Sequence, residues 1–362
     1  MKRRDFTRNL LGLPLSAALP ASIAHAATEA LPALPEGGSI TDVPGLKVGH
    51  HTLTTRPTGC TVVICEKGAT AGVDVRGSAP GTRETDLLSP TNTVEQVQAI
   101  LLSGGSAYGL SAAEGVVRWL EEHHLGYPIA NGVVPIVPAA ILMDLGVGDF
   151  KIRPREEDGY KACLAATTGQ VAEGNVGAGA GATIGKMFGH NFAMKSGLGT
   201  ASVKIGDTGI VVGALVAVNA VGDVIDPRSG KIVAGARSED GKGYRNSMEA
   251  MLNGYRVVIQ NAANTTLGVV ATNARFTKTQ MTKIAQMTHD GYARAINPVH
   301  TMGDGDTIFA LSTGTTEVKA DVSAIGAIAA TVMSRAIVRA VMQATSLPAY
   351  NLPACRDYLR HT

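Results

Sequence analysis

Short apolar runs bounded by glycine or polar residues recur along this chain, and they predict β-strands. Two predicted strands, 202–205 and 210–218, are joined by Gly206-Asp207-Thr208-Gly209, which is typical of a hairpin turn. The other strands are predicted at 59–65, with 69–75 as its hairpin partner, and at 257–259, 266–272 and 307–312.

Other segments carry apolar residues at the three- and four-residue spacing of amphipathic helices. They are 94–102, 108–124, 279–295 and the alanine-rich stretch 321–344. In the third of these, the inner positions include Met281, Ile284, Ala285, Thr288 and Ala295. Paired strands interleaved with helices, without strict strand–helix–strand alternation, favour sheets that pack face to face and are covered by helices.

Composition and charge exclude some partners. The 362 residues are 45% hydrophobic but only 4% aromatic, and 43 of them are glycine, so the chain can bury a large, mainly aliphatic core. The formal net charge of +2 and the lack of a basic run with interleaved aromatic residues give no reason to expect nucleic acid as a partner.

The first 26 residues have the pattern of an export signal. Lys2-Arg3-Arg4-Asp5-Phe6 is a twin-arginine start, an apolar stretch follows at 10–23, and Ala24-His25-Ala26 supplies a cleavage pattern. An amphipathic first helix or an uncleaved anchor is the alternative, but the apolar stretch is short and rich in proline and alanine. We expect a signal peptide at 1–26, a flexible leader at 27–39, a single domain at 40–362, and a periplasmic or secreted protein.

The rest of the chain predicts no stable membrane association, metal or cofactor. No later segment approaches 18 uninterrupted apolar residues. The cysteines lack metal-site spacing, and two of them, five residues apart in one predicted strand, must face opposite sides. We interpret all four as buried small hydrophobes: Cys60, Cys65, Cys163 and Cys355. The glycine-rich run 174–185 lacks the surroundings of a dinucleotide site, so its glycines are expected to allow close backbone approach.

Thr265 is the most informative candidate for chemistry. It lies in Asn264-Thr265-Thr266, directly before an apolar run. A threonine hydroxyl needs a base to act as a nucleophile, and a free α-amine, with a pKa of about 7.7–8.0, can serve. Only cleavage of the Asn264–Thr265 bond would create that amine. Taken alone, the position of Thr265 favours an ordinary threonine at the start of a strand.

Four other polar residues could support such a nucleophile. Asp304 and Asp306 lie two residues apart in a glycine-flanked turn, where close like charges raise one pKa and suit a proton shuttle. A calcium ligand pair or simple turn chemistry are the alternatives. Lys186 follows the glycine-rich run, and Asn219 ends a predicted strand and could donate its amide to an oxyanion. Each of the two is also an ordinary residue for its position.

Five ordered segments together resemble the P1 peptidase family, which includes L-aminopeptidase/D-amino acid esterases, β-peptidyl aminopeptidases and nylon-oligomer (6-aminohexanoate oligomer) hydrolases. The segments are Leu102-Ser103-Gly104-Gly105-Ser106-Ala107-Tyr108-Gly109-Leu110, Gly115-Val116-Val117-Arg118-Trp119-Leu120, Val133-Val134-Pro135-Ile136-Val137-Pro138-Ala139-Ala140, Asn264-Thr265-Thr266 and Asp304-Gly305-Asp306-Thr307-Ile308-Phe309. The likeness runs from about residue 40 to residue 345.

The resemblance implies a four-layer αββα sandwich, similar to N-terminal-nucleophile hydrolases but with its own connectivity. It implies self-cleavage into an α subunit (27–264) and a β subunit (265–362), and assembly of these units into homo-oligomers. Many members cut before a serine, whereas this chain looks like the nylon-oligomer variant with threonine. By this likeness Thr265 is the nucleophile, Asn219 holds the oxyanion, and Lys186, Asp304 and Asp306 orient Thr265 and relay protons.

The same resemblance implies substrate-binding walls from the neighbouring subunit and from residues of two segments: Gly104, Gly105, Tyr108, Val134 and Met143. Met143 stands where nylon-oligomer hydrolases carry a tyrosine, which puts nylon-type oligomers in doubt. The expected activity is hydrolysis of amide or ester bonds in small peptides or amino-acid derivatives, without a cofactor. The alternatives are an acyltransferase of the ornithine acetyltransferase type, which export argues against, and an unprocessed binding protein, which the retained polar residues argue against.

Overall fold

In the computed structural model, residues 36–255 and 264–358 are described, and all of them belong to one compact unit. The predicted signal peptide and the predicted strand at 257–259 lie outside these residues. So does most of the leader. At its end, Ser39 is buried and caps the short 3₁₀ helix η1 (Ile40–Asp42).

Nine strands form one continuous sheet, in the order β10-β11-β16-β18-β2-β4-β7-β3, with β1 paired to β2. Their bounds are β1 (Lys47–Thr52), β2 (Gly59–Val75), β3 (Thr82–Arg83), β4 (Gln96–Ser103), β7 (Ala139–Ile141), β10 (Leu198–Lys204), β11 (Val211–Asn219), β16 (Thr265–Thr272) and β18 (Thr307–Ser312). Strands β16 and β18 run parallel, as do β4 and β7, and the other neighbours in the sheet are antiparallel.

Six α-helices and four small sheets complete the described fold. The helices that cover the sheet are α1 (Ala112–Glu122), α2 (Glu156–Leu164), α4 (Lys278–Ala295) and α5 (Val322–Met342), and α3 (Ser247–Leu252) lies apart from them with the one-turn helix α6 (Cys355–Tyr358). The small strands are β5 (Tyr127–Ile129), β6 (Gly132–Val134), β8 (Thr183–Ile184), β9 (Met194–Lys195), β12 (Asp223–Ile225), β13 (Ile232–Ala234), β14 (Ala236–Arg237), β15 (Tyr244–Arg245) and β17 (Ile296–Asn297).

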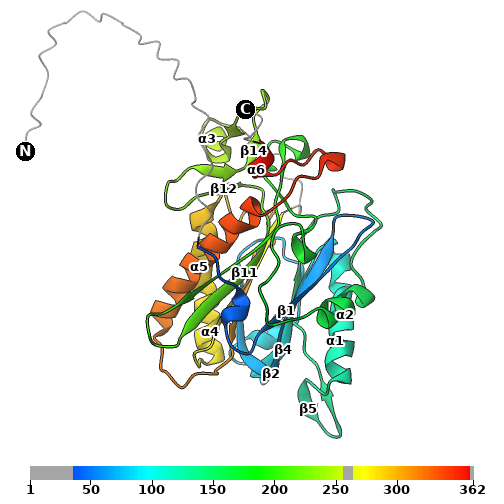
Figure 1. Cartoon of the computed structure of the whole chain (residues 1–362), viewed down its shortest axis with the longest axis vertical. Helices are drawn as coiled ribbons and strands as arrows, with labels where there is room; N and C mark the ends of the chain where they lie inside the picture. Colours follow the sequence, from blue (N-terminus) through cyan, green and yellow to red (C-terminus); the bar gives the residue numbers. More distant parts are fainter. Residues whose placement is uncertain (1–35, 256–263, 359–362) are drawn as a thin grey trace, which may run out of the picture. The chain divides into compact units, whose positions relative to one another are not determined.

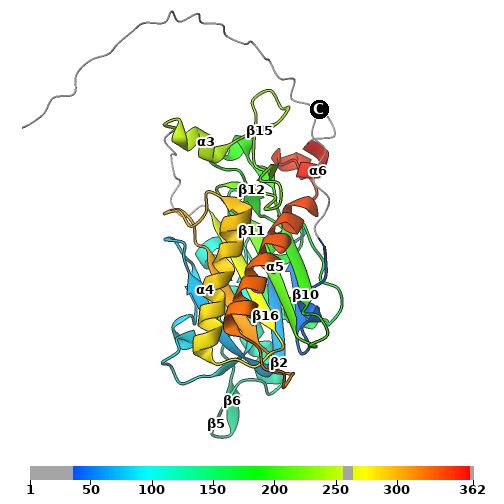
Figure 2. The same cartoon turned by 90° about the vertical axis from the view of Figure 1, so that its left-hand side faces the viewer.

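The sheet folds over on itself along the long strand β2, which takes part in both half-sheets. Its first half pairs with β1 and its second half with β18, while β4 lies along its other edge. Figure 1 shows the result: α4 and α5, the half-sheet that contains β11, the half-sheet with β1, β2 and β4, and then α1 and α2. Figure 2, turned by 90°, shows α4 and α5 side by side over the first half-sheet.

Alternating side chains on the strands build three separate cores between these layers. On β16, Leu267 and Val269 face the other half-sheet, while Val270 faces α4 and α5. On β2, Val63 faces the space between the half-sheets, while Val62 lies in the core beneath α1 and α2. Because successive side chains of a strand point to opposite faces, three cores require four layers. The predicted αββα sandwich is therefore confirmed.

Most predicted elements are confirmed, including the 202–218 hairpin, the strands at 266–272 and 307–312, and the helices at 108–124, 279–295 and 321–344. The first of these helices begins as a 3₁₀ turn, η3 (Ser106–Ser111). The five inner positions predicted on α4 are all buried. By length and hydropathy α5 could cross a bilayer, but 78% of its apolar window is buried in the fold, as in a core helix.

Two predictions were wrong. Residues 59–65 and 69–75 are not a hairpin but the single strand β2, because the segment between them forms an irregularity, with Gly68 in the left-handed region, rather than a turn. Residues 94–102 are not a helix but contain β4. This strand is buried on both faces, with Ile100 on one and Leu101 on the other, so its continuous apolar run resembles a helix segment.

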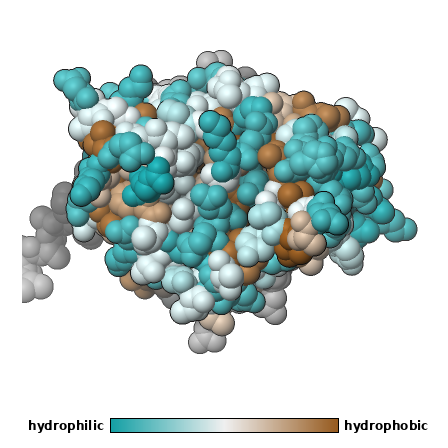
Figure 3. All heavy atoms as spheres, turned by 90° about the horizontal axis from the view of Figure 1, so that it is seen from below, coloured by the Kyte–Doolittle hydropathy of each residue, from teal (hydrophilic) through white to brown (hydrophobic). Residues whose placement is uncertain are grey.

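The cysteine and glycine predictions agree with the structure. All four cysteines are buried free thiols, and Cys60 and Cys65 lie in cores on opposite faces of β2. A side chain at Gly181 would collide with Asp144, whose Cβ lies 2.8 Å from the position of an added methyl. The end of the molecule seen in Figure 3 carries apolar groups interrupted by hydrophilic ones.

Candidate active site

Three strand ends bring the predicted residues to one edge of the sheet. Strands β16 and β18 are parallel neighbours, so their first residues lie together, and the antiparallel strand β11 ends beside the start of β16. In this register Asn219 is the direct partner of Thr265. A bridge between Asn264 and Asp304 continues the parallel pairing of β16 and β18 in the same register. The topology thus gathers residues that are up to 87 positions apart in sequence, as 219 and 306 are.

Thr265 and the peptide bond that precedes it are buried together. Asn264 is 4% exposed and Thr265 is 3% exposed. The Thr265 hydroxyl donates to the carbonyl oxygen of Asn264, and the backbone N–H of Gly305 donates to the same oxygen at 3.0 Å. A Cβ at Gly305 would lie 2.8 Å from the Thr265 hydroxyl oxygen. The hydroxyl is therefore in contact with the carbonyl group that it would attack, and that carbonyl is polarised by an N–H donor.

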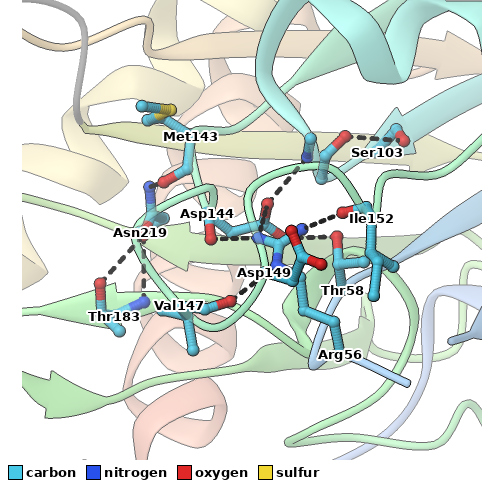
Figure 4. A network of polar contacts seen from close by, with 12 residues as sticks. Arg56, Thr58, Ser103, Met143, Asp144, Val147, Asp149, Ile152, Thr183 and Asn219 are labelled. Carbon is cyan, nitrogen blue, oxygen red and sulfur yellow. Dashed lines mark hydrogen bonds and ion pairs between the residues drawn. The ribbon is translucent and has the colours of Figure 1, made fainter. Parts of the chain in front are cut away.

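Hydrogen bonds fix the orientation of the Asn219 side chain. Its Oδ1 accepts from Lys186 Nζ at 3.0 Å and from the Thr183 N–H at 3.0 Å, so this atom is the oxygen. Its Nδ2 donates to the backbone carbonyl of Met143 at 3.0 Å. Lys186 Nζ also donates to the backbone carbonyl of Asn219. Figure 4 shows Met143 and Thr183 on the two sides of the amide.

The two aspartates have different surroundings. Asp306 accepts from the Thr266 N–H at 2.7 Å with one oxygen, and from the backbone N–H and Nδ1 of His300 with the other, at 3.1 and 2.9 Å. Asp304 accepts from the Thr301 N–H at 2.7 Å through Oδ2, while its buried Oδ1 has no partner among the described residues. The buried Oδ1 of Asn264 is also without a partner there.

Burial shifts the pKa values of two of these groups toward neutrality. Desolvation lowers the pKa of Lys186 to about 7, although the negative charges of Asp304, Asp144 and Asp306 oppose the shift. Desolvation, with the charge of Asp306 added, raises the pKa of Asp304 to about 6. Both groups can therefore gain or release a proton near pH 7, as the prediction of a proton relay requires.

The predicted substrate-binding residues divide into two sets. Gly104 and Gly105 follow β4 and contact the Met143 loop, because the Gly105 N–H donates to the neighbouring Asp144. Tyr108 is 55% exposed, with the guanidinium of Arg153 3.8 Å from its ring centroid. Val134 ends the β5–β6 hairpin, which Figures 1 and 2 draw at the end away from β12. Within one chain, the structure therefore does not bring Val134 close to Thr265 and the polar residues around it.

Five polar residues around this site were not predicted from the sequence: Arg56, Asp144, Thr183, Lys195 and His300. They lie in loops or short strands with no motif of their own, and Arg56 and Asp144 are 88 positions apart. His300 alone had a signal, since it lies six residues before Asp306. A buried ion pair such as Arg56–Asp144 is recognised only once the fold joins its members, 2.6 Å apart.

Calcium binding at the two aspartates finds no support in their contacts. Their carboxylates accept hydrogen bonds from N–H groups, and Asp306 has both oxygens occupied in this way. Within residues 36–255 and 264–358, no group of three histidine, cysteine, aspartate or glutamate side chains is placed to hold a metal ion.

The sequence model of peptidase family S58 matches residues 38–352. An uncharacterized aminopeptidase of Mycobacterium leprae (strain TN) is 44% identical over 339 residues, which are 85% of this chain and 91% of that protein. A 6-aminohexanoate-oligomer endohydrolase of Kocuria sp. (strain KY2) is 32% identical over 314 residues, covering 83% of this chain and 84% of that protein.

Solved structures share the fold. A β-aminopeptidase of Burkholderia sp. superposes with a TM-score of 0.65 at 23% identity, covering 92% of this chain and 96% of that one. An L-aminopeptidase D-Ala-esterase/amidase of Ochrobactrum anthropi, described as a variant of the Ntn-hydrolase fold, gives 0.66 at 21% identity, covering 91% and 96%. At these identities the likeness concerns the fold alone, and it agrees with the four layers.

Proposed function

This chain belongs to peptidase family S58 and is a hydrolase of the aminopeptidase type, and from that premise we propose that it cuts itself between Asn264 and Thr265 to become active. One observation carries the proposal: the Thr265 hydroxyl contacts the carbonyl of the residue before it, and Gly305 donates to that carbonyl from the other strand. The Gly305 donor comes with the pairing of the two strands, whereas the contact between the hydroxyl and the preceding carbonyl is specific to the Thr265 side chain.

In the first stage the Thr265 oxygen attacks the carbonyl carbon of Asn264. The Gly305 N–H stabilises the oxyanion that forms on the Asn264 oxygen, because it already donates to that atom. The hydroxyl proton moves through Lys186 or Asp304 to the Thr265 nitrogen as the peptide bond breaks. Water then hydrolyses the resulting ester, leaving a carboxylate on Asn264 and a free hydroxyl and α-amine on Thr265.

In the second stage the free Thr265 hydroxyl attacks the carbonyl of a substrate amide or ester. The new α-amine, which titrates at about 7.7–8.0 in an ordinary chain, takes the hydroxyl proton and passes it to the leaving amine or alcohol. The Nδ2 group of Asn219 has a second hydrogen, besides the one donated to Met143, with which it can hold the oxyanion. Water releases the acyl group. The substrates are small peptides or amino-acid amides, with esters as a second class.

Supporting parts of the proposal concern the place of the enzyme and its assembly. The twin-arginine start and the Ala24-His25-Ala26 pattern support export to the periplasm or beyond, in a folded state. The family resemblance supports assembly of the cut units into a homo-oligomer whose neighbouring subunit completes the substrate pocket.

Gel electrophoresis with N-terminal sequencing tests the self-cleavage. We expect fragments 27–264 and 265–362, the second beginning at Thr265. Thr265→Ala should give one uncut chain without activity, whereas Thr266→Ala, which keeps the hydroxyl of Thr265, should still be cut. A single intact band in an active wild-type preparation would refute self-cleavage. A panel of α-amino-acid amides, β-amino-acid amides, D-amino-acid esters and aminohexanoate oligomers then identifies the acyl group.

A further inference from the structure

The loop that receives the Asn219 amide is held by a buried ion pair that the proposed reaction does not use. The guanidinium of Arg56 donates to Asp144 Oδ1 at 2.6 Å, and both side chains are fully buried. Figure 4 shows the pair beside Asn219, separated from it by the Met143 backbone. A buried pair of this kind is costly to desolvate, so a position next to an active site calls for an explanation.

Every contact of Arg56 holds the same loop. Its Nε donates to the carbonyl of Val147 at 2.6 Å, its Nη1 to the carbonyl of Ile152 at 2.8 Å, and its Nη2 to the backbone carbonyl of Asp144 as well as to the side chain. A planar guanidinium with fixed donor directions can hold several carbonyls in one arrangement, which lysine cannot do. Arg56 therefore fixes the course of residues 144–152.

Asp144 ties this loop to two further segments. Its carboxylate accepts from the Thr58 hydroxyl at 2.6 Å and from the Gly105 N–H at 2.9 Å, in addition to Arg56. One buried carboxylate thus joins the segment before β2, the turn after β4 and the loop after β7. Gly104 packs so closely that a Cβ there would collide with the same carboxylate.

Met143 is fixed from both sides as a result. On one side, the Leu142 N–H donates to Ser103 O at 2.9 Å and Leu142 O accepts from the Ser106 N–H at 3.0 Å. On the other side lies Asp144 with its three partners. The Met143 carbonyl has little freedom to turn, and it is the acceptor that directs one hydrogen of Asn219 Nδ2. The direction of the second hydrogen follows, because both lie in the plane of the amide.

We infer that Arg56 and Asp144 form a positioning pair, which acts through the Met143 carbonyl to aim the Asn219 amide at the oxyanion formed during substrate hydrolysis. The inference rests on the proposed function, because it assumes that Asn219 stabilises this oxyanion. Neither residue of the pair touches the reacting atoms. Their effect is on the transition state, in which the oxyanion exists, and not on the binding of uncharged substrate.

Three variants test the inference in the full-length protein, on an amino-acid amide that the wild type cleaves. Asp144→Asn and Arg56→Lys should lower kcat by about 100-fold and leave KM within two-fold, since loss of an oxyanion donor costs about 10²–10³ in kcat. Thr58→Val removes one hydrogen bond and little volume, and it should lower kcat by about three- to ten-fold. It is the variant that decides the outcome where the first two fail to fold.

The matched control is Glu173→Gln, which disrupts a second buried ion pair, Glu173–Arg339, whose side chains are each 9% exposed. Its melting temperature should fall while kcat stays within two-fold of the wild type. The inference is overturned if the variants at 56, 58 and 144 retain kcat, or if KM rises and kcat does not fall. An uncut but active wild type would refute self-cleavage instead, and the comparison of kcat values would still decide the role of the pair.

Discussion

Two buried carboxylates near the candidate active site, those of Asp144 and Asp304, have contrasting hydrogen-bonding surroundings. Asp144 has an arginine, a threonine hydroxyl and a backbone N–H on its carboxylate. Asp304 has a single N–H partner, a buried oxygen without a partner in the described part of the chain, and a pKa raised to about 6. A buried carboxylate with several hydrogen-bond donors holds its neighbours in place, whereas a buried carboxylate oxygen without a donor is costly to keep charged. The first region therefore suits a structural role, and the second suits the proton transfer that we propose.

Two of the buried lysines, Lys186 and Lys195, repeat the contrast. Burial lowers the pKa of both to about 7. Lys195 donates to three backbone carbonyls, those of Gly179, Ala182 and Ser196, and so braces the glycine-rich run. Lys186 donates to Asn219, and the negative charges of three nearby aspartates oppose the lowering of its pKa. A similar pKa therefore does not distinguish the two lysines, and we assign Lys186 to the proposed reaction because of the residues that it contacts.

The largest expected effect comes from replacing Lys186, which tests the contrast between the two lysines directly. Lys186→Met should slow self-cleavage by about 10²–10³-fold, because it removes a proton carrier. Lys195→Met leaves carbonyls unsatisfied and should cost about 2 kcal/mol of stability, with cleavage slowed only a few-fold. Timed gels and thermal melts of the two variants measure both quantities. Equal slowing in the two variants would contradict the distinction.

The pH dependence of self-cleavage sharpens the choice between Lys186 and Asp304 as proton acceptor. An acceptor works in its deprotonated form, so the rate should rise with pH and level off above the pKa of the group. With Asp304 the midpoint lies near 6 and the rate at pH 5 falls about 10-fold, whereas with Lys186 the midpoint lies near 7 and the fall is about 100-fold. Rates of cleavage of refolded precursor from pH 5 to 9 decide it. A rate that is flat across this range would exclude both.

The smallest expected effect concerns His300, which holds Asp306 through Nδ1 at 2.9 Å. His300→Ala should slow cleavage about three- to ten-fold, because Asp306 keeps its contacts with the N–H groups of Thr266 and of residue 300. His300→Asn, whose amide can still donate, should recover part of the rate. Gel time courses at matched temperature measure this, with Asp306→Ala as the stronger reference. Equal rates of self-cleavage in the Ala and Asn variants would show that the contact of the His300 side chain with Asp306 does not affect the rate.

Sequence patterns predicted the strands around the site well, because β11, β16 and β18 are short apolar runs with clear polar boundaries. They failed at β4, where burial on both faces hides the two-residue alternation, and at the irregularity in β2. The resemblance of the chain to a known family identified the site residues Thr265, Asn219, Lys186, Asp304 and Asp306. Arg56, Asp144 and Lys195 were missed, since a single arginine, aspartate or lysine has no local pattern.

The sequence by itself determined the family, the four layers and the identity of the five polar residues around the candidate cut. These follow from local periodicity and from ordered motifs, which can be recognised without knowing which residues are neighbours in the folded chain. The tertiary structure alone decided that Thr265 contacts the carbonyl before it, that Asn219 is aimed by Met143, and that Asp144 is satisfied while Asp304 is not. The reason is physical: desolvation and hydrogen bonding depend on neighbours across the sheet edge, and those neighbours are chosen by strand register, not by proximity in the chain.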